Sequence, residues 1–178
     1  MKKFLFKGCG TAISTPFNDE GVNLKEFAKL VEEQINNQVD AIIVCGTTGE
    51  SATMTEEERL QTIECAVKTS NGRVPIIAGT GSNNTKAVIE MNKKVEKLGV
   101  DGLLIVTPYY NKTTQKGLIE HYKVIATDIN HWEKIKNDFN SKKKVYNYIE
   151  EKISLNEIFK ENKEENKLSD FEDIVEYE

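Results

Sequence analysis

Residues 41–51 read Ala41-Ile42-Ile43-Val44-Cys45-Gly46-Thr47-Thr48-Gly49-Glu50-Ser51. The stretch begins as a continuous apolar run, which is typical of a strand buried on both faces of a parallel sheet. It ends in two threonines between two glycines, where the backbone can turn sharply and come close to a ligand. Ligands of α/β folds bind at the carboxyl ends of the strands. The hydroxyls and free N–H groups of this turn therefore predict a small polar nest that suits a carboxylate.

An apolar strand followed by an amphipathic helix occurs four times in residues 8–126, at a spacing of about 30 residues. The strands are expected at residues 8–17, at the start of 41–51, at 73–81 and at 102–106. Regular alternation of buried strands and helices predicts a parallel sheet with helices outside it.

The expected helices carry signals for their first and last turns. The side chains that can cap them are those of Asn23, Thr55, and either Asn84 or Thr85. Glu26 stands three residues after the first cap, as in a capping box. Gly99 is expected to end the third helix, and the fourth is expected at residues 115–126.

Turn-forming and polar residues follow every expected strand. They are Thr15-Pro16-Phe17, Gly46-Thr47-Thr48-Gly49-Glu50, Gly79-Thr80-Gly81 and Thr107-Pro108-Tyr109-Tyr110. Polar chemistry at all the strand ends is typical of barrel enzymes, although four units fit either an open doubly wound sheet or half of an eight-unit barrel. No GxGxxG motif follows the first strand, which argues against a dinucleotide-binding fold. We interpret Gly79-Thr80-Gly81 as a tight turn rather than a phosphate site.

Composition narrows the class of protein. The chain of 178 residues has a net charge of −5 and no Lys/Arg cluster flanked by aromatic residues, so no nucleic-acid partner is expected. No apolar run approaches the roughly 20 residues of a membrane span, and the run of three after Lys3 is too short for a signal peptide, so we expect a cytoplasmic protein.

The chain contains three cysteines and two histidines. We expect Cys9, Cys45 and Cys65 to be buried reduced thiols, and His121 and His131 to be solvated without a metal.

Residues 131–178 differ from the preceding part of the chain. They contain 22 charged residues among 48 and neither glycine nor proline. Apolar residues recur at helical spacing, namely Trp132, Ile135, Phe139, Val145, Ile149 and Ile153. We therefore predict two domains, a βα domain at residues 1–130 and a charged amphipathic helical tail at 131–178 whose acidic end is partly disordered.

Three motifs, in order and each at the end of a strand, resemble the dihydrodipicolinate synthase (4-hydroxy-tetrahydrodipicolinate synthase) family. They are Gly46-Thr47-Thr48-Gly49-Glu50-Ser51-Ala52-Thr53, Ile77-Ala78-Gly79-Thr80-Gly81-Ser82-Asn83 and Val106-Thr107-Pro108-Tyr109-Tyr110-Asn111. The family belongs to the pyruvate-dependent class I aldolases and lyases. The resemblance covers residues 4–129 and implies an α/β fold, the first four βα units of a (β/α)₈ TIM barrel with parallel strands, followed by an unrelated tail.

The resemblance implies a reaction and a site. The family condenses pyruvate with L-aspartate-4-semialdehyde through a lysine Schiff base, on the route to diaminopimelate and lysine, without a cofactor. Thr48 and Gly49 would hold the pyruvate carboxylate, and Thr47 and Tyr110 would belong to a proton relay. A hydroxyl can pass a proton without carrying charge. Tyr110 is offered across a subunit interface in the family, which implies a homo-oligomer through the Tyr109/Tyr110 face.

Other catalytic and substrate-binding residues of the family lie outside the segment that the resemblance covers. The Schiff-base lysine lies on the sixth strand, and a second relay tyrosine and a substrate-binding arginine follow the fifth. We therefore expect a truncated synthase that is inactive alone. The alternative is a non-catalytic half-barrel whose helical tail covers the open sheet or docks a partner. Pairing of two half-barrels and a sequence artefact near residue 130 are further alternatives.

The resemblance also concerns feedback inhibition by lysine. Two positions that are histidines in inhibited members of the family are Glu56 and Arg59 here, and a glutamate position is Ala87. Asn83, Ser51 and Tyr109 match the inhibited members. We therefore expect no inhibition by lysine.

Overall fold

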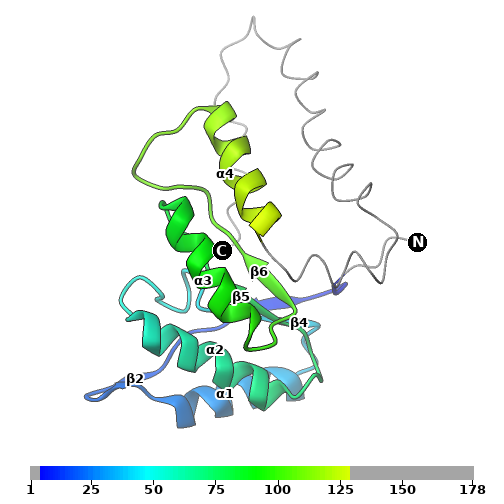
Figure 1. Ribbon diagram of the computed structural model, residues 1–178. Helices are drawn as coiled ribbons and strands as arrows, with labels where there is room; N and C mark the ends of the chain where they lie inside the picture. Colours follow the sequence, from blue (N-terminus) through cyan, green and yellow to red (C-terminus); the bar gives the residue numbers. More distant parts are fainter. Residues whose placement is uncertain (1–4, 129–178) are drawn as a thin grey trace, which may run out of the picture. The chain divides into compact units, whose positions relative to one another are not determined.

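The structure, a computed structural model, describes residues 5–128. Within these residues a parallel sheet has the strand order β1-β4-β5-β6, and four helices alternate with its strands (Figure 1). The strands are β1 (Gly10–Ala12), β4 (Ala41–Val44), β5 (Ile76–Gly79) and β6 (Gly102–Leu104). The helices are α1 (Leu24–Asn36), α2 (Glu56–Ser70), α3 (Thr85–Glu96) and α4 (Gln115–Asp128). The α/β prediction is confirmed, whereas the predicted tail at 131–178 lies outside the described residues.

The helix starts follow the predicted caps. Asn23 accepts the N–H of Glu26 at 3.2 Å, and Asn84 accepts the N–H groups of the two residues after Thr85, so Asn84 rather than Thr85 is the third cap. Thr55 forms a complete capping box with Glu58. Each such cap satisfies backbone donors that the helix itself leaves unpaired.

The helices cover one face of the sheet. Fully buried apolar side chains from both layers form the core, namely Ile42, Val44, Ile76 and Ala78 from the strands and Phe27, Val31, Ile63 and Ala66 from α1 and α2. Side chains alternate along a strand, so the residues between them face the other way. Ile43 and Ile77 are only half-buried there, and Leu104 is 48% exposed. The described residues thus leave the second face of the sheet apolar and partly open.

The first strand is shorter than the predicted 8–17. The chain leaves β1 after Ala12 and forms a small antiparallel hairpin, β2 (Phe17–Asn18) with β3 (Gly21–Val22). Pro16 has no N–H to give to the sheet, and the Asn18 side chain accepts the N–H of Glu20 at 3.0 Å to form the turn. A proline and an asparagine turn therefore end the parallel strand early.

His121 is buried, which contradicts the prediction that it is solvated. It is 6% exposed, and its Nδ1 lies 2.8 Å from Oγ1 of Thr85, so it joins α4 to the start of α3. His121 stands four residues before the buried Ile125, on the same face of the helix. The buried stripe of α4 is therefore wider than its apolar residues alone indicate.

The cysteines are free thiols in three different environments. Cys45 is buried and Cys65 is half-buried, but Cys9 is exposed just before β1, so burial was wrongly predicted for it. Cys9 lies where the chain enters β1, an edge strand of the described sheet.

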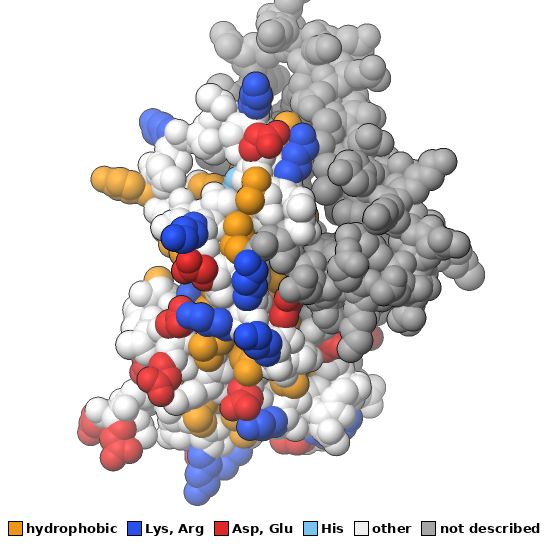
Figure 2. Space-filling model, in the orientation of Figure 1, with side chains coloured by type: hydrophobic (Ala, Val, Ile, Leu, Met, Phe, Trp, Pro, Cys, Tyr) orange, Lys and Arg blue, Asp and Glu red, His pale blue; other side chains and the backbone are white. Residues whose placement is uncertain are grey.

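The surface carries charges of both signs. On the face drawn in Figure 2, Lys and Arg side chains are interspersed with Asp and Glu side chains. Several form pairs within one helix, such as Lys29 with Glu26 and Lys68 with Glu64, and exposed pairs of this kind contribute about 0–1 kcal/mol each. None of the helices among residues 5–128 is both long enough and apolar enough to cross a membrane.

The buried histidine predicts a pH dependence of stability. Burial lowers the pKa of His121, so the folded state favours the neutral ring. The neutral ring therefore stabilises the folded state fully above pH 6.5, the ordinary pKa of histidine. This contribution is lost as the pH falls from there through the lower pKa that His121 has in the folded protein. The free energy of unfolding from urea titrations should therefore fall more between pH 7.5 and pH 5 in the wild type than in His121→Gln. Parallel pH profiles of the two proteins would contradict this account.

Candidate functional site

The loop after β4 begins and ends in an unusual backbone conformation. Cys45 and Glu50 both have φ of +54°, in the left-handed region that non-glycine residues rarely adopt. The N–H of Glu50 donates to the carbonyl of Thr47 at 3.0 Å and closes the turn between them. Such conformations cost about 1–3 kcal/mol each and are typical of ligand sites.

Glycines let the strand ends touch backbone to backbone. A methyl group on Gly79, at the end of β5, would lie 2.2 Å from the carbonyl oxygen of Cys45. A methyl group on Gly81 would lie 2.4 Å from the backbone nitrogen of Val106, which follows β6. No side chain fits at either position, so the exits of β4, β5 and β6 lie side by side as one surface. This agrees with the tight-turn interpretation of residues 79–81.

Thr15 ties the exit of β1 to the same loop, and the sequence analysis did not assign it this role. It is 4% exposed, and its hydroxyl donates to the carbonyl of Gly49 at 2.8 Å. Gly49 is itself buried, and a methyl group on it would lie 3.0 Å from the backbone nitrogen of Cys45. A threonine near the end of an expected strand was the available signal, but its partner is 34 residues away in the chain.

The two central threonines of the loop remain accessible. Thr47 and Thr48 are exposed, and neither hydroxyl makes a hydrogen bond to any residue between 5 and 128. They project from a backbone that Gly49 and the left-handed residues at both ends hold in place. The structure therefore brings Thr47, Thr48 and Gly49 together as an open polar turn at the carboxyl ends of the strands.

Tyr110 lies in the loop after β6 and is 98% exposed, with φ of +69°. The loop is fixed by Asn111, whose side-chain amide donates to the carbonyl of Asn83 at 3.1 Å. Tyr109 beside it is 54% exposed. In the described part of the chain no hydrogen bond joins Tyr110 to Thr47, the two residues predicted to relay protons.

Two residues named for the family's lysine site are engaged by other protein groups. Glu56 forms an ion pair with Lys94 of α3. The guanidinium of Arg59 donates to the carbonyl of Gly79 at 2.9 Å. Burial raises the pKa of the neighbouring Cys45 thiol to about 11, so the thiol stays protonated and can donate to the Arg59 carbonyl.

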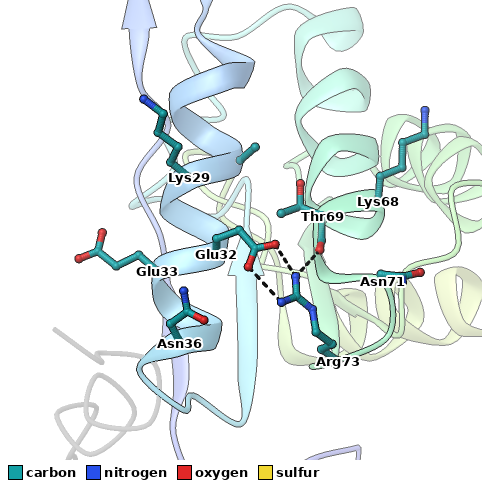
Figure 3. Close-up of a pocket in the computed structure, with 9 residues that line it drawn as sticks. Lys29, Glu32, Glu33, Asn36, Lys68, Thr69, Asn71 and Arg73 are labelled. Carbon is teal, nitrogen blue, oxygen red and sulfur yellow. Dashed lines mark hydrogen bonds and ion pairs between the residues drawn. The ribbon is translucent and has the colours of Figure 1, made fainter.

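The groove in Figure 3 lies between α1 and α2. Polar and charged side chains line it, namely Lys29, Glu32, Glu33, Asn36, Lys68, Thr69, Asn71 and Arg73. Arg73 bridges it with two hydrogen bonds to Glu32, which lower the pKa of that carboxyl (Figure 3). Most of its residues lie in the second half of α1 and at or just after the carboxyl end of α2, whereas the strand exits precede the helices, and its central charges are paired. We therefore place the candidate site at the strand exits. No group of three metal-ligating side chains occurs in residues 5–128.

The contact between strand exits predicts a steep steric effect. Gly79→Ala should lower the free energy of unfolding by about 3 kcal/mol or more, because its new methyl group collides with a backbone carbonyl that cannot rotate away. Gly46→Ala is the matched control, since its nearest neighbours would lie 3.8 Å away, and it should cost about 1 kcal/mol or less. Urea denaturation of both variants tests this, and equal losses would contradict the proposed contact.

Comparison with known proteins matches the described fold to one family. Residues 5–135 match the model of the Dihydrodipicolinate synthetase family. The chain is 59% identical to 4-hydroxy-tetrahydrodipicolinate synthase 1 of Clostridium acetobutylicum over 126 residues, which are 71% of this chain and 43% of that protein. It thus spans less than half the length of this relative. The resemblance carried by the three strand-end motifs is confirmed.

Solved structures agree. Dihydrodipicolinate synthase from Aquifex aeolicus superposes with a TM-score of 0.68 at 46% identity, over 70% of this chain and 43% of that one. The chloride-inhibited enzyme from Acinetobacter baumannii complexed with pyruvate gives a TM-score of 0.67 at 47% identity, over 68% and 42% of the two chains.

Proposed function

The chain belongs to the dihydrodipicolinate synthetase family, and from this premise we propose that its strand-end turn binds the carboxylate of pyruvate. The observation that carries the proposal is the pair of exposed hydroxyls on Thr47 and Thr48, held on a backbone fixed by buried neighbours. One relative with this fold is described as a pyruvate complex. Pyruvate is a small carboxylate, and the free N–H and O–H donors of a tight turn suit such a group.

The architecture around the site is that of an incomplete barrel in this proposal. We propose that residues 5–128 are the first four units of a (β/α)₈ barrel. Each parallel strand is paired with the next one along the chain, without the reversal of order that marks a doubly wound sheet. Helices cover one face, and the other face carries Leu104 and Val106 at 48% and 40% exposure, as the interior of an incomplete barrel would. The matched relatives are more than twice as long as the matched segment.

The reaction proposed for the complete site is that of 4-hydroxy-tetrahydrodipicolinate synthase, in which pyruvate condenses with L-aspartate-4-semialdehyde. Thr48 and the N–H of Gly49 would hold the carboxylate, and Thr47 with Tyr110 would move protons. The near-complete exposure of Tyr110 suits a side chain that serves a second copy of the chain. We further propose that the family's Schiff-base lysine lies outside the matched segment, and that this chain binds pyruvate without turning it over.

Pyruvate affinity tests the proposed site. Calorimetric titration of the full chain should show binding that Thr48→Val weakens about tenfold, because the variant keeps the shape and loses the hydroxyl donor. Thr127→Val is the control, since the hydroxyl of that exposed threonine donates to the carbonyl of Lys123 within α4. Equal affinity in wild type and Thr48→Val, or no binding by the wild type, would refute the site.

Borohydride reduction in the presence of pyruvate tests the absence of turnover. A Schiff base needs a lysine that is partly neutral near pH 7, which burial or a nearby cation must provide. We expect the intact mass of the chain to stay unchanged after reduction. A covalent adduct of the size of pyruvate would show an activated lysine in this chain, and peptide mapping would then identify it.

A further inference from the structure

Arg59 carries a charge that no described carboxylate neutralises. It is half-buried in the first turns of α2, and it forms no ion pair with any acidic side chain between residues 5 and 128. Its Nε is buried and has no hydrogen-bond partner in that part of the chain. Other cations of the described surface do have acidic partners, for example Arg73 with Glu32 and Lys94 with Glu56. A half-buried guanidinium that lacks such a partner pays for desolvation without the usual compensation.

The contacts of Arg59 instead lead to two strand exits. Its guanidinium donates to the carbonyl of Gly79 at 2.9 Å, at the end of β5. Its backbone carbonyl accepts the S–H of Cys45 at 3.9 Å, directly after β4. One residue of α2 therefore contacts the backbone of Gly79 and the thiol of Cys45, the two residues that meet where the exits of β4 and β5 touch.

We propose that Arg59 is a positioning residue that holds the Thr47–Thr48 turn in its binding conformation. The chain of contacts is short. Arg59 fixes the carbonyl of Gly79, Gly79 packs against the carbonyl of Cys45, and Cys45 begins the turn with φ of +54°. The backbone of Cys45 in turn packs against Gly49, the last residue of the nest. The inference rests on the proposed pyruvate site.

A purely structural role for Arg59 makes a different prediction. If the guanidinium mainly stabilised the fold, its removal would lower stability and binding together. The lack of an acidic partner and the unpaired Nε argue that removal relieves about as much desolvation as it loses in hydrogen bonding. We therefore expect that removal of the guanidinium makes residues 45–49 less ordered and changes the unfolding temperature of the protein only a little.

The variants are Arg59→Met, which keeps the apolar stem and removes all donors, and Arg59→Lys, which keeps the charge and a donor for the Gly79 carbonyl. Lys68→Met is the control on the same helix, with an exposed ammonium paired to Glu64. In the full chain, Arg59→Met should weaken pyruvate binding about tenfold, with an unfolding temperature within about 4 °C of the wild type. Arg59→Lys should recover part of the affinity, and Lys68→Met should match the wild type.

Amide hydrogen exchange gives a readout that does not depend on pyruvate. Arg59→Met should speed exchange in residues 45–49 about tenfold, while exchange in α1 and β1 stays unchanged. Wild-type exchange in residues 45–49 together with wild-type affinity would overturn the inference. If the wild type binds no pyruvate, the proposed function fails, and the exchange rates still decide whether Arg59 orders the turn. If Arg59→Met does not fold, the inference requires that Arg59→Lys exchange faster than the wild type in residues 45–49. Exchange in α1 and β1 must then stay unchanged.

Discussion

The candidate site depends on a backbone contact in which Gly79, at the end of β5, leaves no room for a side chain beside the carbonyl of Cys45 after β4. Only a residue without a side chain allows two parallel strands to leave the sheet in such contact. Cys45, which makes this contact, has the left-handed conformation at which the chain turns after β4. The hydroxyl of Thr15 then holds the far end of the turn. Three strands that are distant in sequence thus shape one loop, residues 45–50.

The buried and the exposed residues of this loop have different roles. The residues that set its shape are buried, namely Cys45, Gly49, Gly79 and Thr15. The residues that carry its chemistry, Thr47 and Thr48, are exposed and keep their hydroxyls free of other described groups. A neutral hydroxyl is a suitable donor to a carboxylate in such a place, because it requires no buried counter-charge. Membership of the dihydrodipicolinate synthetase family makes pyruvate the carboxylate that we propose for this turn.

Much of this could be predicted from the sequence because it depends on neighbours in the chain. The βα alternation, the caps Asn23 and Thr55 and the polar strand ends are local patterns, and the structure confirms them. The contacts of Thr15 and Arg59 could not be predicted, since their partners are 34 and 20 residues away. His121 was misplaced because a polar residue within an apolar stripe was assigned to solvent. The site roles of Thr47, Thr48, Gly49 and Tyr110 stay predictions, as does the charged helical tail.

Backbone amide shifts in the full chain, labelled with ¹⁵N and titrated with pyruvate, test the central claim most directly. The account predicts saturable shifts that are largest at Thr48 and Gly49 and smaller at Gly79 and Gly81, which share the strand-end surface. Shifts confined to another place, such as the groove around Arg73, or no shifts at all, would contradict it.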